Sequence, residues 1–268
     1  MEINGKPVAQ MTTREALEII RDHQQREFKL SQERAQQERL KHRKTILRGF
    51  KYNLEDEDQY RIHASLLKDI GDNYMLREFS SYQVDEHNEK VLRFLLYYFN
   101  GCPLAEEVFP DEDYKIYKNL MLIGEPGTGK TMIMQIFSDY LRATENENAF
   151  RNISMTQLMN YYKINGHIDR FTFNELADLK SYEGNPFNVC LNDLGLMTES
   201  QKSFGTTLTQ VTDEFLFARY EIYQQFNKRY HITSNLDVED LKTRFEDRLV
   251  DRFKSFNVIE LHGKSRRK

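Results

Sequence analysis

The sequence predicts a three-layer α/β fold around a parallel sheet, preceded by a helical N-terminal extension. From residue 119 onward, short apolar runs typical of buried strands alternate with longer segments whose apolar residues recur at helical spacing. Such alternation is typical of a parallel sheet covered by helices on both faces. The expected strands are 119–123, 149–153, 187–192, 229–234 and 257–261. The expected helices are 130–143, 155–163, 206–226 and 238–253.

The composition is that of a chain able to bury a core. Of the 268 residues, 39% are hydrophobic, and the net formal charge is only −4, so any contact with nucleic acid must come from a local basic patch. Two widely separated cysteines, Cys102 and Cys190, favour a reducing, cytoplasmic setting without disulfides. No apolar run approaches the ~18 residues of a membrane-spanning helix, and no signal peptide is evident. We therefore expect a cytoplasmic protein without a membrane partner.

One eight-residue segment carries the most specific signal in the chain. It fits the pattern G-x-x-x-x-G-K-[ST], in which backbone N–H groups cradle phosphate oxygens. It lies between an expected strand and an expected helix, which places the positive end of the helix dipole against the phosphates. We therefore expect ATP and Mg²⁺ as cofactors, with Lys130 meeting the β- and γ-phosphates and the Thr131 hydroxyl meeting the metal. The residues expected to bind ATP here are Gly124, Glu125, Pro126, Gly127, Thr128, Gly129, Lys130, Thr131 and Met132.

In a second motif, at 189–195, an apolar run is followed by Asn192 and Asp193. In P-loop ATPases of the additional-strand class, two acids follow such a strand: the first supports Mg²⁺ and the second polarises the attacking water. In the preferred register, Asn192 is the metal residue, and its amide can hydrogen-bond a Mg²⁺-bound water without adding charge. A register shifted by one makes Asp193 the metal residue and leaves no general base. Either register lacks one acid, so we expect slow hydrolysis.

Two further polar residues are candidates for contacts with the nucleotide. Asn235 follows the strand at 229–234, where it is either a turn residue or a sensor that reaches the γ-phosphate or the attacking water. Arg267 lies in the basic C-terminal run. That run is a simple basic tail, a source of a second sensor arginine, or a contact to a nucleic-acid backbone.

Three arginines in the expected helix 238–253 recur at i, i+4 and i+8, so they share one helical face: Arg244, Arg248 and Arg252. That face is either solvent-exposed and paired with neighbouring aspartates, or it delivers an arginine finger in trans to the ATP of a neighbouring subunit. We favour the finger, with Arg252 ahead of Arg248, and count Asp193, Asn235 and Arg252 as the catalytic residues.

The first 80 residues form a different kind of segment. A helix is expected from about residue 12 to 48, but it is too polar to hold itself in a core, so it projects into solvent or binds a partner. The segment 39–51 carries six Lys or Arg residues and no acid, which fits a solvated face or a contact with nucleic acid or an acidic partner. We divide the chain into a helical partner-binding region, 1–80, and an ATP-binding domain, 81–268.

Residues from about 80 to 268 resemble the AAA+ ATPases of the initiator group, above all the DnaC-type helicase loaders and the IstB-type transposition helper ATPases. That resemblance implies ATP-dependent spiral assemblies on single-stranded DNA and N-terminal segments that dock partner proteins. It also implies a DNA contact near 155–173, where Lys163 and Arg170 lie among aromatic residues suited either to base stacking or to the core. The likeness is carried by Gly124–Thr131, Asn192-Asp193-Leu194-Gly195, Phe217-Ala218-Arg219-Tyr220-Glu221, Thr233-Ser234-Asn235, Arg248-Leu249-Val250-Asp251-Arg252-Phe253 and a terminal Gly-x-Ser-x-Arg that ends at Arg267.

The expected function is therefore that of an ATP-binding accessory protein of DNA replication. It would act as a helicase loader that forms an ATP-dependent homo-oligomer and binds single-stranded DNA and a replicative hexameric helicase. A transposase-helper ATPase, whose partner is a transposase, is the alternative among nucleic-acid enzymes. A non-hydrolysing, nucleotide-gated scaffold is the alternative from another class, motivated by Asn192.

Overall fold

The computed structural model describes residues 52–173, 186–195 and 206–266, with short pieces at 2–3, 6–7, 12, 21–31 and 202–203. The chain divides into two compact units, Met1–Phe50 and Lys51–Lys268. In the first unit, β1 (Glu2–Ile3) pairs antiparallel with β2 (Lys6–Pro7), and an exposed helix covers 21–31. The remainder of the expected helix 12–48 and the basic segment 39–51 lie outside the described residues.

The compact unit that contains the P-loop thus begins at Lys51, before the boundary expected at residue 80. Residues 57–80 belong to it because α2 (Glu57–Met75) packs against the helix that follows the P-loop. A partner-binding role for the N-terminal region stays a prediction. Every helix in the described part of the chain is too short or too polar to cross a lipid bilayer.

A five-stranded, all-parallel sheet forms the centre of the second unit, with strand order β4-β5-β8-β3-β9. β8 lies between the strand that precedes the P-loop, β3, and the strand that ends in the Asn192-Asp193 motif, β5. This is the arrangement of the additional-strand class, so the predicted three-layer P-loop fold is confirmed. The strands are β3 (Asn119–Ile123), β4 (Phe150–Ser154), β5 (Asn188–Leu194), β8 (Tyr230–Ser234) and β9 (Phe256–Glu260). β6 (Lys202–Ser203) and β7 (Thr206–Thr207) form a separate two-stranded pair.

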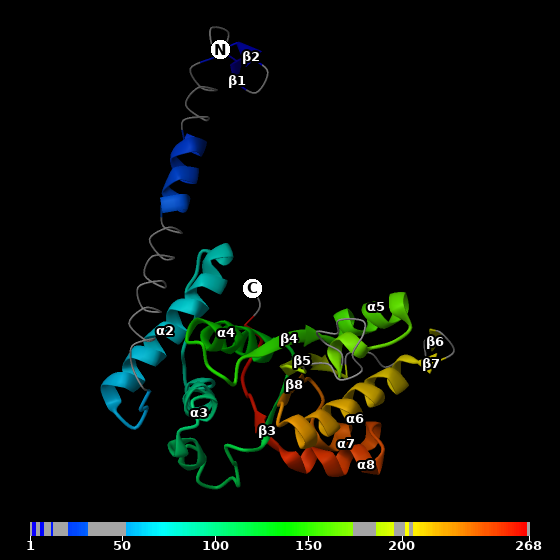
Figure 1. Ribbon diagram of the computed structural model, residues 1–268. Helices are drawn as coiled ribbons and strands as arrows, with labels where there is room; N and C mark the ends of the chain where they lie inside the picture. Colours follow the sequence, from blue (N-terminus) through cyan, green and yellow to red (C-terminus); the bar gives the residue numbers. More distant parts are fainter. Residues whose placement is uncertain are drawn as a thin grey trace. The chain divides into compact units, whose positions relative to one another are not determined.

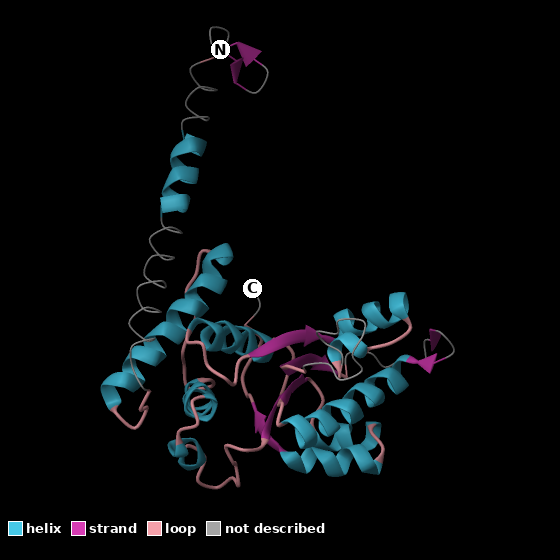
Figure 2. Ribbon diagram, in the orientation of Figure 1, coloured by secondary structure: helices cyan, strands magenta, loops and turns pink. Residues whose placement is uncertain are grey.

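Helices cover both faces of the sheet (Figures 1 and 2). On one face, Phe99 of α3 contacts Phe150, His231 and Phe137 of α4 with ring centroids 5.4 Å apart in each case. On the other face, side chains of α5, α6 and α8 form a continuous core with those of β5 and β8. The helices besides α2 are α3 (Glu89–Phe99), α4 (Lys130–Ala143), α5 (Met155–Asn165), α6 (Leu208–Phe226), α7 (Val238–Arg244) and α8 (Asp247–Arg252). Short 3₁₀ turns occupy Leu76–Glu78, Pro103–Glu107, Asp169–Phe171 and Phe253–Ser255.

The expectation of one helix over 238–253 is wrong. The backbone is extended at Phe245 (φ −104°, ψ 150°) and at Glu246 (φ −60°, ψ 149°), so two short helices replace one. The Phe245 ring is buried against Phe253, with centroids 5.7 Å apart. Arg244 therefore does not share a helical face with Arg248 and Arg252.

Candidate functional site

The P-loop adopts a backbone that only glycine accepts readily. Gly124 and Gly127 have φ values of 135° and 87°, in the left-handed region. A Cβ atom on Gly124 would lie 2.4 Å from the Leu261 carbonyl oxygen, and one on Gly127 would lie 2.3 Å from Ser265 Oγ. The loop thus needs glycine both for its own turn and because the C-terminal segment 261–266 packs directly against it.

α4 begins immediately after this loop, with Gly129 as its N-cap. The N-terminal N–H groups of a helix, together with its dipole, form an anion-binding site. Lys130 Nζ lies beside them and donates to the carbonyl oxygens of Gly124 (2.6 Å) and Glu125 (2.8 Å). The Lys130 side chain is almost fully buried, so its positive charge is concentrated at the loop. This arrangement of loop, ammonium and helix end suits phosphate oxygens.

The chain has the fold of a P-loop NTPase.

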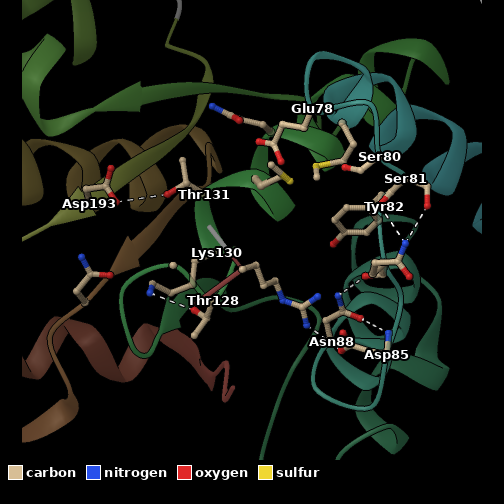
Figure 3. A pocket seen from close by; sticks show the side chains of 18 residues that line it. Glu78, Ser80, Ser81, Tyr82, Asp85, Asn88, Thr128, Lys130, Thr131 and Asp193 are labelled. Carbon is tan, nitrogen blue, oxygen red and sulfur yellow. Dashed lines mark hydrogen bonds and ion pairs between the residues drawn. The ribbon is translucent and has the colours of Figure 1, made fainter. Parts of the chain in front are cut away.

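A cavity of about 500 Å³ opens next to the loop (Figure 3). One side consists of Gly127–Met132 with Gln135 of α4, and the ends of β5 and β8 contribute Asp193 and Asn235. The opposite side comes from a segment that precedes the P-loop by some distance in the sequence, between Met75 and Asn88. A volume of this size is within the range of small-molecule and cofactor sites, roughly 300–1,000 Å³.

Asp193, not Asn192, is the residue that lies next to the P-loop threonine. Thr131 Oγ1 donates to Asp193 Oδ1 at 3.4 Å. Asn192 is buried and does not line the cavity: its Nδ2 donates to Asn152 Oδ1 (3.0 Å), and its Oδ1 accepts from Thr233 Oγ1 (3.3 Å). This geometry favours the shifted register, in which Asp193 is the metal residue, and the metal role of Asn192 stays a prediction.

The physical cause is a local distortion of β5. The pairing of β5 with β8 shifts register between Leu191 and Leu194, and Asp193 takes a left-handed backbone (φ 63°). The Asp193 N–H is held by Thr233 Oγ1 at 3.0 Å. This turn directs the carboxylate of Asp193 toward the P-loop. No local pattern indicates this distortion, because the apolar run continues without a break up to Asn192.

The remaining expected residues divide into those at the cavity and those elsewhere. Asn235 lines the cavity, as expected for a residue at the tip of β8. Arg252 lies outside the cavity lining: its guanidinium stacks over Phe217 (4.2 Å) and Tyr220 (4.6 Å) of its own subunit. Its role as a finger in trans stays a prediction. Arg267 lies outside the described residues.

Arg266, the residue before Arg267, lines the cavity. Its backbone N–H donates to the Gly127 carbonyl (2.9 Å), and its Nη2 donates to Asp85 Oδ1 (2.8 Å). This hydrogen bond lowers the pKa of Asp85 below its ordinary value. Arg266 and Lys130 are the two cationic side chains among the described residues of the lining.

The segment between Met75 and Asn88 was not foreseen as part of the site. Within it, Asn88 Oδ1 accepts from the Asp85 N–H (2.9 Å) and Asn88 Nδ2 donates to the Gln83 carbonyl (2.9 Å), which closes a compact loop. Tyr82 is buried in this segment, and burial raises the pKa of its phenol to about 12. The only sequence signal was a break in helical pattern near Ser80.

The expected DNA-contact region contains both core and surface residues. Tyr162 is buried and belongs to the core, whereas the rings of Tyr161 and Phe171 are half-buried and contact each other at 5.0 Å. Lys163 and Arg170 are exposed beside them.

Neither family models nor curated proteins match the sequence. Similar solved structures include AMPPCP-bound DnaA from Aquifex aeolicus, with 19% identity, a TM-score of 0.40, and coverage of 67% of this chain and 48% of that chain. The DnaC helicase loader aligns with 19% identity and a TM-score of 0.42, and the alignment covers 67% of this chain and 92% of that chain. Domain III of the Thermotoga maritima replication initiation protein DnaA aligns with 21% identity and a TM-score of 0.44. The alignment covers 67% of this chain and 64% of that chain. The fold assignment rests on the strand order and the P-loop geometry.

Proposed function

We propose that this protein binds ATP with Mg²⁺ at the cavity beside the P-loop. The observation that carries the proposal is the convergence of Lys130, the Thr131–Asp193 pair and Asn235 on one cavity that borders the N-terminus of α4. Hydroxyl and carboxylate oxygens are the ligands that Mg²⁺ prefers. Among the described residues, no group of three His, Cys, Asp or Glu side chains could hold a metal alone. This suits a Mg²⁺ ion bound by one carboxylate together with phosphate oxygens, whose negative charge it offsets.

Calorimetry of the full chain with ATP and Mg²⁺ at millimolar concentrations tests this proposal. Lys130→Ala removes the cation at the loop and is expected to weaken ATP binding by at least about 100-fold, because an ion pair at ~4 Å contributes several kcal/mol at an effective dielectric constant near 20. Lys264→Ala is the matched control, since Lys264 is exposed and does not line the cavity. Wild-type protein that is folded but releases no heat with ATP would refute the proposal.

We infer that hydrolysis is slow. Asp193 lies beside Thr131, where we propose that the metal binds, and the next residue, Leu194, is a buried core side chain. No second carboxylate of β5 is therefore available as a general base, and we infer that Asn235, which lines the cavity at the end of β8, orients the water molecule. Single-turnover hydrolysis, measured with and without single-stranded DNA, tests this inference. Zero turnover in both conditions, together with tight ATP binding, would favour the nucleotide-gated scaffold.

For the cellular role, we propose a helicase loader of DNA replication that forms an ATP-dependent homo-oligomer. The order of the motifs from the P-loop to Arg252, and the resemblance to DnaC-type loaders that they carry, support this role. The exposed cations Lys163 and Arg170, beside the half-buried rings of Tyr161 and Phe171, suit single-stranded DNA. The IstB-like alternative uses the same nucleotide site with a transposase as partner.

Affinity capture with the full chain in the presence of ATP distinguishes the two roles. Recovery of a hexameric helicase supports the loader, and recovery of a transposase supports the alternative. A chain lacking residues 1–50, which keeps the whole compact unit Lys51–Lys268, tests whether the first unit binds the partner. Full retention of the partner by this shorter chain would contradict the proposed role of the N-terminal region.

A further inference from the structure

The sheet contains a β-bulge where β5 approaches the P-loop. The pairing of β5 with β8 is regular up to Leu191 and resumes at Leu194. Between these pairs, β5 has two residues, Asn192 and Asp193, opposite a single residue of β8, Thr233. Bulges of this kind interrupt the hydrogen-bond ladder and change the direction of a side chain, and they are over-represented next to active sites.

The Thr233 hydroxyl binds both bulged residues of β5. It accepts a hydrogen bond from the Asp193 N–H (3.0 Å) and donates one to Asn192 Oδ1 (3.3 Å). Thr233 is fully buried, and its branched Cβ restricts χ1, so the hydroxyl has a fixed direction. One side chain of β8 therefore supplies a partner for the Asp193 N–H at the point where the ladder is interrupted.

Asn192 sets the direction of the Thr233 proton. Its Nδ2 donates to Asn152 Oδ1 (3.0 Å), and Asn152 Nδ2 donates to the Met134 carbonyl of α4 (3.4 Å). These bonds orient the Asn192 amide so that its oxygen faces Thr233. The Thr233 proton therefore points to Asn192 Oδ1, and a lone pair of the hydroxyl is left for the Asp193 N–H. A chain of hydrogen bonds thus connects α4 to the backbone of Asp193.

The backbone of Asp193 needs such support. Its φ of 63° lies in the left-handed region, which costs free energy for any residue other than glycine. In this conformation the carboxylate faces Thr131, whose Oγ1 donates to Asp193 Oδ1 at 3.4 Å (Figure 3). Strained residues persist only where the surrounding structure holds them, and they are concentrated at functional sites.

We propose that Thr233 is a positioning residue for Mg²⁺: its hydroxyl holds Asp193 in the turn that presents the carboxylate to the metal. This inference rests on the proposed function, in which the metal binds beside Thr131 and Asp193. Thr233 does not line the cavity, so it acts through Asp193 and not on the nucleotide itself. A change at Thr233 therefore weakens the metal site and leaves Lys130 at the phosphate site.

The experiment measures the affinity of the full chain for ATP with Mg²⁺ and with EDTA, and takes the ratio of the two affinities. Thr233→Val removes the hydroxyl and nearly keeps the shape of the side chain. It is expected to lower the ratio about 10-fold, the lower end of the range for outer partners of metal ligands. Thr233→Ser keeps the hydroxyl and is expected to keep the wild-type ratio. An unchanged ratio in Thr233→Val, or an equal fall in Thr233→Ser, would overturn the inference.

A matched control and a double variant test the route of the effect. Thr144 is also buried, its hydroxyl donates to the Tyr140 carbonyl (3.0 Å), and it does not line the cavity. Thr144→Val is expected to lower the melting temperature and to keep the ratio; a fall here would mean that lost stability alone explains the effect. Combining Thr233→Val with Asp193→Asn is expected to give the ratio of Asp193→Asn alone. A further fall would contradict action through Asp193.

The outcomes separate this inference from the proposed function. If the wild type does not bind ATP, or binds it equally with Mg²⁺ and with EDTA, the proposed function fails and the inference falls with it. If Asp193→Asn lowers the ratio and Thr233→Val does not, the metal site stands and the inference alone is refuted. Should Thr233→Val fail to fold, Thr233→Cys carries the same expectation, because sulfur is only a weak acceptor.

Discussion

Replacing Asn192 with aspartate separates the two possible registers at the end of β5. Asn192 has 3% of its surface exposed, and its Nδ2 donates to Asn152 Oδ1 at 3.0 Å. In Asn192→Asp, a carboxylate oxygen faces that acceptor, and the pair becomes repulsive. Asn152 can turn its amide to compensate only by giving up the bond from its own Nδ2 to the Met134 carbonyl (3.4 Å). The substitution therefore buries a charge without an adequate donor.

The expected cost of Asn192→Asp is about 2–4 kcal/mol, the range for a buried charged group that lacks a full set of partners. For a domain of this size, that corresponds to a fall in melting temperature of about 5–10 °C. Because Asn192 does not line the cavity, ATP turnover per folded molecule is expected to stay the same. Thermal unfolding and single-turnover hydrolysis measure the two effects. Faster turnover with unchanged stability would refute the reasoning and restore Asn192 as the metal residue.

Three further predictions concern the site and its surroundings. Asp193→Asn is expected to reduce the Mg²⁺ dependence of ATP binding, measured as the ratio of affinities with Mg²⁺ and with EDTA; an unchanged ratio would exclude Asp193 from the metal site. Arg252→Ala is expected to spare ATP binding and to abolish DNA-stimulated hydrolysis, and unchanged stimulation would contradict the finger in trans. His63 is buried against the Tyr140 hydroxyl, and burial lowers its pKa from 6.5 to about 4. The unfolded state binds this proton more readily, so the free energy of unfolding is expected to fall by up to about 3 kcal/mol as the pH decreases from 6.5 to 4. Denaturant titration at several pH values should show a smaller loss of this free energy for His63→Gln.

Much of the fold could be predicted because its signals are local. Each expected strand of the sheet lies within one or two residues of an observed one, since a buried parallel strand is a short continuous apolar run. The P-loop could also be predicted from the sequence, because eight consecutive residues contain both the glycines that its backbone requires and the charge of Lys130. The single helix expected over 238–253 was wrong because its apolar pattern continues through Phe245, where the backbone is extended.

The site was predicted on the P-loop side and missed on the opposite side. Lys130, Thr131 and Asn235 follow from strand–loop–helix patterns, and the structure brings them to one cavity. Ser80 and Tyr82 reach the cavity through the packing of α2 on α4, which no local pattern encodes. The choice between Asn192 and Asp193 depends on a register shift within the sheet, and the place of Arg266 at the cavity depends on how the C-terminal segment crosses Gly127.

The helix α2 lies in the sequence between the end of the first unit and a residue of the cavity wall. Its last residue, Met75, forms part of the cavity wall, while its first turn begins only a few residues after the first unit ends. The Tyr74 hydroxyl of α2 donates a hydrogen bond to Asp139 (2.7 Å) of α4, the helix that follows the P-loop. If nucleotide binds as proposed, a macromolecule that displaces α2 would alter the wall of the nucleotide site. Thermodynamic reciprocity then requires nucleotide to change the affinity for that macromolecule by the same factor.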